Sequence, residues 1–262
     1  MRADVTRLDL RLRRRSLTGF AAGMAVYALV IVALYPQFKN SSNLNQLTRN
    51  GSAVAALFGA TGTLTSPAGW LSANIYANFL PLIMLLVTIG YGAACIAGQD
   101  ESGTLCLTTA LPLTRTSILL QKAAALAGQA VLVGAATMIC VAAGRDSGLA
   151  IPSGHLAGIT IGITMAGIDF GLLALTIGCW TGNRGTALGI ASAAAAVSYL
   201  ISSLAPVVGW IRPARYASLL YWSVGDDQLT VGLSPASAAV LVAVGGLLLA
   251  AAALGFRRMD LH

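Results

Sequence analysis

The segment ANFLPLIMLLVTIGYGAACIAG, residues 77–98, decides the fold class of this chain. It contains no Lys, Arg, Asp or Glu, and it is long enough to supply the roughly 20 apolar residues that a helix needs to cross a bilayer. Hydrocarbon cannot satisfy free backbone amide and carbonyl groups, so a segment of this kind crosses as a helix. Residues 77–98 therefore predict a membrane protein.

The rest of the chain has the same character. Of its 262 residues 56% are hydrophobic and only 10% are charged, whereas a soluble domain carries about 25% charged residues. Long stretches without charge predict six membrane-spanning helices, near residues 17–35, 77–98, 119–143, 156–180, 186–206 and 236–256. Six spans leave no room for a soluble domain of ordinary size. We therefore predict an all-α polytopic membrane protein with a single transmembrane domain, residues 1–262.

The net charge of +7 does not indicate nucleic acid, because the basic residues are distributed by side. Eleven of the 16 Lys and Arg residues fall on the side that holds both termini, which predicts cytoplasmic termini by the positive-inside rule. Residues 2–16 place Val5, Leu8 and Leu12 on one helical face among arginines. This pattern predicts an interfacial helix whose arginines meet anionic headgroups. The alternative is a disordered basic tail that only orients the chain.

Two segments are expected on the outer side. Residues 36–75 form a long loop whose polar part cannot enter hydrocarbon. Residues 207–235 mix aromatic and charged side chains with prolines, which favours short helices half-sunk at the outer surface between spans five and six. This second segment suits an aromatic anchor belt or an outer gate, and the two roles are compatible.

The loop between spans two and three, GQDESGTLCLTTALPLTR at residues 98–115, is polar, and it contains the only glutamate of the chain. A helix is expected to start at about Ser102 after two acidic residues, to end at Pro112, and to be followed by Thr114 as the cap of span three. The apolar side of this helix comprises Leu105, Leu107 and Leu111. The order of these signals predicts a short rigid helix on the cytoplasmic side, and the alternative is a simple connecting loop.

Residues 98–122, GQDESGTLCLTTALPLTRTSILLQK, resemble the coupling segment of type-2 ABC exporter permeases (the ABC-2 family). Three more segments are similar to that family: residues 66–99 at the entry to span two, residues 180–206 around span five, and residues 210–233 before span six. The chain departs from the family at residues 217–219, where relatives often have Ser-Pro-Phe and this chain has Ala-Ser-Leu.

The resemblance implies a half-transporter of the bacterial plasma membrane that exports its substrate. It would pair with an identical or similar permease chain and bind two ATPase subunits, which would hold ATP and Mg. The chain itself lacks a G-x-x-x-x-G-K-[ST] phosphate loop, so no catalytic residue or cofactor is expected in it. The residues that the resemblance assigns to ATPase contact are Asp100, Glu101, Gly103, Thr104, Leu105, Pro112 and Arg115.

In the resembled family, spans two and five flank a cavity between protomers. The candidate pathway residues are Asn78, Tyr91, Ser198, Tyr199 and Ser202 in these two spans, with Tyr27 in span one and Asp169 in span four. The serines suit helix packing nearly as well as a pathway. Few charges line this path, which favours an apolar or amphipathic solute. A drug, an antibiotic, a peptide and a lipid are all compatible.

Asp169 supports a different hypothesis, because an acid in the middle of a membrane span is costly and is by default a candidate functional residue. It suits a proton- or ion-coupled carrier, although no second acid lies in any span. The alternative is a buried Asp whose oxygens bind neighbouring hydroxyl or backbone groups. An intramembrane enzyme is a third class, but His155 and His262 show no metal-binding or nucleophile spacing.

Overall fold

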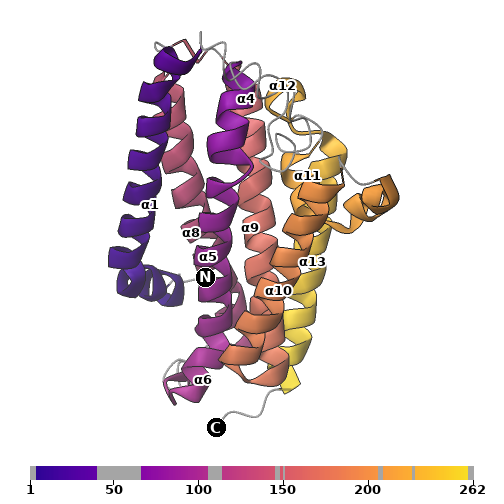
Figure 1. The fold of residues 1–262 in the computed structure, drawn as a ribbon. Coiled ribbons are helices and arrows are strands. Elements are labelled where there is room, and N and C mark those ends of the chain that lie inside the picture. The colour runs from indigo at the N-terminus through magenta and orange to yellow at the C-terminus, as the bar shows by residue number, and fades with distance from the viewer. Residues whose placement is uncertain are drawn as a thin grey trace.

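The computed structural model describes residues 4–39, 66–105, 114–144, 148–149, 151–205, 209–225 and 228–258. Within these ranges the regular secondary structure is helical (Figure 1). Six helices are long and apolar enough to cross a membrane. The prediction of an all-α protein with six transmembrane helices is therefore confirmed.

The six long elements match the predicted spans and extend most of them by a few residues. They are α1 (Asp4–Phe38), α5 (Phe79–Ala93) with its extensions, α8 (Arg115–Ala143), α9 (Ser153–Thr181), α10 (Arg184–Leu204) and α13 (Pro235–Arg258). Helix α5 is lengthened at both ends by α4 (Pro67–Leu71), the π-helix η1 (Ser72–Tyr76), the π-helix η2 (Ala94–Gly98) and α6 (Gln99–Glu101). We call the end of the bundle near α6 the α6 end, and the opposite end the α4 end.

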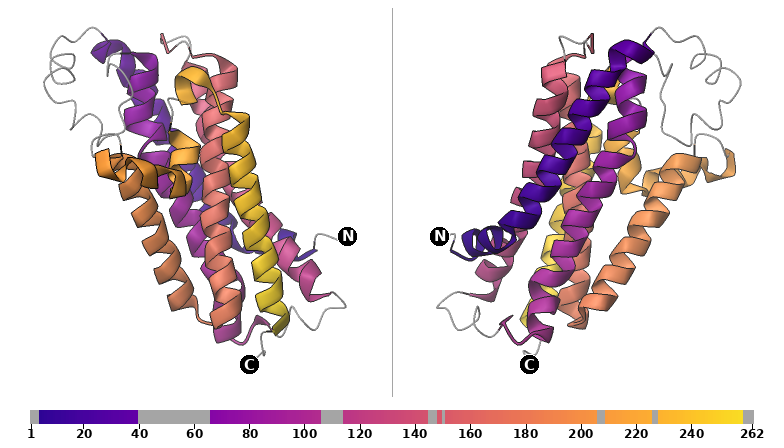
Figure 2. Two further views of the ribbon diagram at one scale, coloured as in Figure 1. Left: turned by 90° about the vertical axis from the view of Figure 1, so that its right-hand side faces the viewer. Right: turned by 60° about the vertical axis from the view of Figure 1, so that its left-hand side comes forward.

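Helix α1 includes both the predicted interfacial helix and the first span. Figures 1 and 2 show that its first turns lie across the bundle, and the remainder then runs along α8 toward the α4 end. Of the three apolar residues expected on one face of residues 2–16, Val5 is 2% exposed, whereas Leu8 and Leu12 are 50% and 73% exposed. The face that packs on the protein therefore differs from the apolar face read from the sequence. The location of this segment at a membrane surface stays a prediction.

Helix α9 is the centre of the bundle and packs against α5, α8, α10 and α13. Glycines allow these close approaches, because a Cβ on Gly92 of α5 would overlap the carbonyl oxygen of Gly171 in α9. A Cβ on Gly167 would likewise overlap the side chain of Met84. Small residues at contacts are the usual means by which membrane helices pack tightly.

Helix α10 leans away from α9 toward the α4 end in both views of Figure 2. Near the α4 end of α10 and α13 lie the 3-10 helix η4 (Gly209–Ala217), α11 (Leu219–Val224) and α12 (Gln228–Val231). Short helices were expected in this segment, and they are present. Tyr216, Tyr221 and Trp222 form an aromatic cluster there, and the guanidinium of Arg215 lies 4.8 Å from the Tyr216 ring centroid. Most of the predicted outer loop 36–75 lies outside the described residues.

Candidate functional site

The polar loop after span two begins as a tight turn. Helix α6 ends at Glu101, and Gly103 adopts a positive φ of 67°, a conformation that favours glycine. The backbone N–H of Thr104 donates to the carbonyl oxygen of Gln99 at 2.9 Å. Residues 102–104 therefore form a turn, so the helix expected from about Ser102 starts no earlier than Leu105. The rest of that predicted helix, with Pro112, lies outside the described residues.

Glu101 joins this loop to span five. Its Oε1 atom accepts a hydrogen bond of 2.8 Å from the backbone N–H of Arg184, the first residue of α10. The Oδ1 atom of Asn183 accepts from the N–H of Thr186 at 2.8 Å. Two side chains thus satisfy donors at the positive end of α10, and the charge of Glu101 also complements the helix dipole. The neighbouring Asp100 has a buried Oδ1 atom with no hydrogen-bond partner among the described residues.

The far end of the loop is joined to span six. Thr114 caps α8 through a hydrogen bond of 3.3 Å from the N–H of Ser117, as predicted. Arg115 donates at 3.1 Å to the carbonyl oxygen of Phe256, near the end of α13, and its guanidinium lies 5.9 Å from the Phe256 ring centroid. Leu105 is 1% exposed within a core cluster that includes Phe256. Two residues expected to meet a partner, Leu105 and Arg115, therefore make contacts inside this chain.

A buried polar cluster lies at the same end, formed by Asp9, Tyr91, Gln99 and Lys122, and we call it the Asp9 cluster. The Tyr91 hydroxyl donates to Asp9 Oδ2 at 2.6 Å, and Lys122 Nζ lies 3.5 Å from the same oxygen. Lys122 also donates to Gln99 Oε1 at 2.7 Å. Lys122 is 0% exposed, so its ammonium group lies inside the protein. The cluster joins α1, α5 with its η2 and α6 extensions, and α8.

Two sequence signals point to the Asp9 cluster in retrospect. Asp9 is one of two acids in the arginine-rich residues 2–16, and Lys122 lies two turns inside span three rather than at its first residue. A buried lysine needs an acid or a hydrogen-bond acceptor beside it. The sequence could not show that Asp9 is the partner, because the bend of α1 brings the two residues together.

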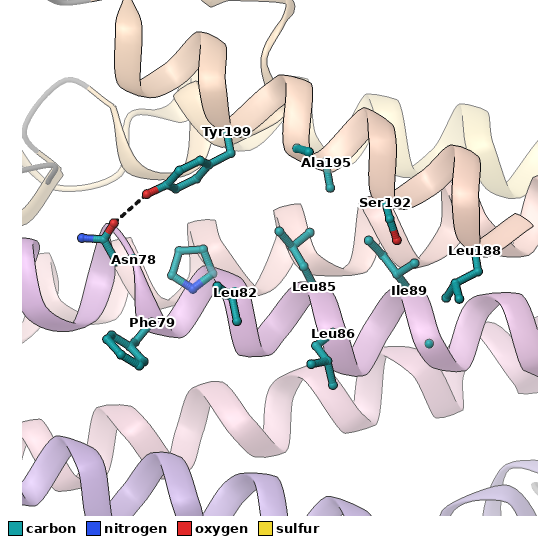
Figure 3. Close-up of a pocket in the computed structure, with 13 residues that line it drawn as sticks. Asn78, Phe79, Leu82, Leu85, Leu86, Ile89, Leu188, Ser192, Ala195 and Tyr199 are labelled. Atoms are coloured by element: carbon teal, nitrogen blue, oxygen red, sulfur yellow. Dashed lines mark hydrogen bonds between the residues drawn. The ribbon is translucent and has the colours of Figure 1, made fainter. Parts of the chain in front are cut away.

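An apolar pocket of about 430 Å³ lies between α5 and α10 (Figure 3). Leu82, Leu85 and Ile89 from α5 face Leu188 and Ser192 from α10. Toward the α4 end, the Tyr199 hydroxyl donates to Asn78 Oδ1 at 2.7 Å and joins the two walls. The pocket is lined mainly by carbon, so it suits an apolar molecule or the apolar part of an amphipathic one.

The structure distributes the predicted pathway residues over several places. Asn78 and Tyr199 line the apolar pocket, whereas Tyr91 lies in the Asp9 cluster. Tyr27 donates to the carbonyl oxygen of Asn74 at 3.0 Å, and Ser202 is half-buried and does not line the pocket.

Ser198 is buried, with its Oγ atom 2.8 Å from Ser218 Oγ. Its hydroxyl also accepts from the N–H of Leu220 at 3.4 Å. These contacts join α10 to the start of α11, so they match the helix-packing alternative for the serines.

Asp169 lies on α9 beside α13, away from the apolar pocket. It is 3% exposed, and its Oδ2 atom is buried without a hydrogen-bond partner among the described residues. One alternative read from the sequence was a buried Asp169 that binds a hydroxyl or backbone group. The described residues supply no such partner for Oδ2. A Cβ on Gly245 of α13 would come within 2.7 Å of Asp169 Oδ1, so that glycine makes room for the carboxyl group.

Comparison with curated proteins finds no match. The model of one protein family, described as ABC-2 family transporter protein, matches residues 3–261. The six spans and the polar loop after span two agree with the resemblance read from the sequence. Because the match covers nearly the whole chain, this protein belongs to the ABC-2 family, and it is a multi-pass membrane permease of the ABC transporter class.

Proposed function

We propose that this chain is the permease subunit of an ATP-driven exporter of apolar or amphipathic solutes. ABC-2 permeases work with ATPase subunits in general. In this proposal two such subunits bind ATP and Mg and dock at the α6 end, which faces the cytoplasm of a bacterial cell together with both termini. A second permease chain, identical or similar, completes the transporter.

The observation that carries the proposal is the connection between the polar loop and both walls of the apolar pocket. One wall, α5, runs through η2 directly into α6 and the loop. The other wall, α10, is held at its first residue by Glu101 of the same loop. A force on the loop therefore acts on both walls at once, and a relative movement of α5 and α10 changes the pocket.

The contacts of Arg115 extend this mechanism to span six. Its hydrogen bond to the carbonyl oxygen of Phe256 joins the second end of the loop to α13. The loop is thus fixed at both ends to helices that are distant in sequence. An isolated connecting loop has no need of such contacts, whereas a segment that transmits a push from a docked subunit does.

The pocket supports the proposed substrate class. Asn78, Ser192 and Tyr199 are its polar residues, and the remaining lining is apolar. None of the described residues that line the pocket is charged, so an ion is a poor ligand and a drug, antibiotic, peptide or lipid with an apolar part is a better one. Asp169 is not among these lining residues, so it does not support a proton-coupled carrier that acts at this pocket.

The test is co-purification of the tagged full chain from its native membranes, with mass-spectrometric identification and stoichiometry. A P-loop ATPase in equal amount is expected.

Glu101→Ala should lower transport and substrate-stimulated ATP hydrolysis several-fold while the protein still inserts, because α10 loses its connection to the loop. Glu101→Gln keeps an acceptor for the Arg184 N–H and should retain more activity.

Lys39→Ala is the matched control, since Lys39 is exposed near the end of α1 that lies toward the α4 end. It should leave the complex and its transport unchanged. A stable complex without any ATPase would contradict the proposal, as would full transport by Glu101→Ala at normal expression.

A further inference from the structure

A second cleft, of about 230 Å³, lies at the α6 end between the first part of α1 and the helices α5 and α10. It is distinct from the apolar pocket, and no residue lines both. Charged and polar side chains line much of it, among them Asp9, Arg13, Tyr91, Gln99 and Arg184. The two arginines come from helices that are far apart in sequence.

The cleft carries an excess of positive charge. Asp9 is its acidic lining residue, and that carboxylate already accepts from Tyr91 and pairs with the buried Lys122. Arg13 stacks on Tyr91, with its guanidinium 5.0 Å from the ring centroid. Lys122–Asp9 is the only ion pair among the described residues. No carboxylate oxygen of these residues therefore lies within 4.0 Å of the guanidinium nitrogens of Arg13 or Arg184.

The position of Arg184 is set by packing and not by an acidic partner. Its methylene groups lie against Gly98, where a Cβ would come within 3.1 Å of the Arg184 Cδ. The backbone N–H of Arg184 donates a hydrogen bond to Glu101, yet the Glu101 carboxylate forms no ion pair with the Arg184 guanidinium. The guanidinium is therefore held at the cleft with no carboxylate oxygen of the described chain within 4.0 Å.

We propose that this cleft binds the phosphate headgroup of an anionic phospholipid, with Arg13 and Arg184 as its two cationic contacts. Guanidinium groups bind phosphate oxygens through paired, charge-assisted hydrogen bonds. Leu12 lines the cleft and is 73% exposed, and Leu8, one turn earlier, is 50% exposed. These two side chains give acyl chains an apolar surface beside the phosphate, which a soluble phosphate would not use.

A lipid bound in this way would join the first part of α1 to the first residue of α10. Because Glu101 holds that same residue, the lipid would also restrain the polar loop. A bound anionic lipid would therefore act on the connection between the loop and the apolar pocket. The inference goes beyond the proposed export function, since lipid binding requires neither a substrate nor an ATPase.

The test is native mass spectrometry of the purified full chain in detergent, titrated with phosphatidylglycerol or phosphatidylcholine. The cleft variant is Arg13→Gln with Arg184→Gln, which keeps most of each side chain and its packing. The control is Arg11→Gln with Arg14→Gln, which removes the same charge from exposed positions of α1 outside the cleft. The cleft variant should bind phosphatidylglycerol at least roughly tenfold more weakly, and the control should change binding by less than about twofold.

The two single variants keep the test decisive if the double variant aggregates. Each should weaken phosphatidylglycerol binding several-fold, and Arg184→Lys should recover part of the loss. Equal loss in the cleft variant and the control would overturn the proposal, because the effect would then be general surface attraction. Displacement of the lipid by millimolar inorganic phosphate would overturn the lipid assignment in favour of a soluble anion.

Discussion

Replacement of Lys122 by methionine is expected to destabilise this protein by about 4 kcal/mol, because it leaves the Asp9 carboxylate buried without its cation. Asp9 is 6% exposed, so water has little access to its carboxylate. At the observed 3.5 Å, two unit charges attract by about 5 kcal/mol at an effective dielectric constant of about 20. Removal of one partner of a buried pair costs about 3–5 kcal/mol, which agrees with that value.

The double variant Asp9→Asn with Lys122→Met separates the charge effect from packing. It leaves no uncompensated charge, and the Asn amide oxygen can still accept from the Tyr91 hydroxyl. We expect it to cost less than about 2 kcal/mol, which gives a coupling energy of about 2 kcal/mol or more between the two positions. The free energy of unfolding is measured by denaturant titration in mixed micelles. The exposed Lys39→Met is the control and should change it by less than about 0.5 kcal/mol.

Two results would refute this reasoning. A loss of less than about 1 kcal/mol in Lys122→Met would mean that water reaches the Asp9 cluster or that the pair does not form. A double variant as unstable as the sum of the single variants would mean that the two charges act independently.

Three more predictions concern the pocket, the helix packing and Asp169. Leu82→Trp should fill the apolar pocket and lower transport several-fold. Leu247→Trp is the control, at a position on α13 that is 71% exposed, and it should leave transport unchanged. An equal loss of transport in both variants would show that the pocket is not part of the pathway. Gly92→Ala should destabilise the fold by about 1–3 kcal/mol through overlap with the α9 backbone, while Gly189→Ala, with no atom within 4 Å of its added Cβ, should be neutral or slightly stabilising in thermal unfolding. Asp169→Asn should retain ATP-driven transport in proteoliposomes, and complete loss would instead favour a proton-coupled carrier.

The sequence alone determined the fold class and the number of spans. An uncharged apolar segment of this length crosses a bilayer as a helix irrespective of the helices around it. Residues 77–98 and the five other segments were therefore enough to predict the fold class and the six spans. The cap at Thr114 was readable for a similar reason, because a helix start is a local event.

Only the tertiary structure decided which residues meet. The contact of Glu101 with the first residue of α10, and that of Arg115 with the end of α13, join positions 83 and 141 residues apart. Lys122 and Asp9 lie 113 residues apart, and only the bend of α1 brings them together. Local patterns can place a residue on a helix and at a depth, but its partner depends on how six helices rotate and tilt. For that reason Tyr91, which the sequence indicated as a pathway residue, lies in a buried polar cluster, while Asn78 and Tyr199 line the pocket.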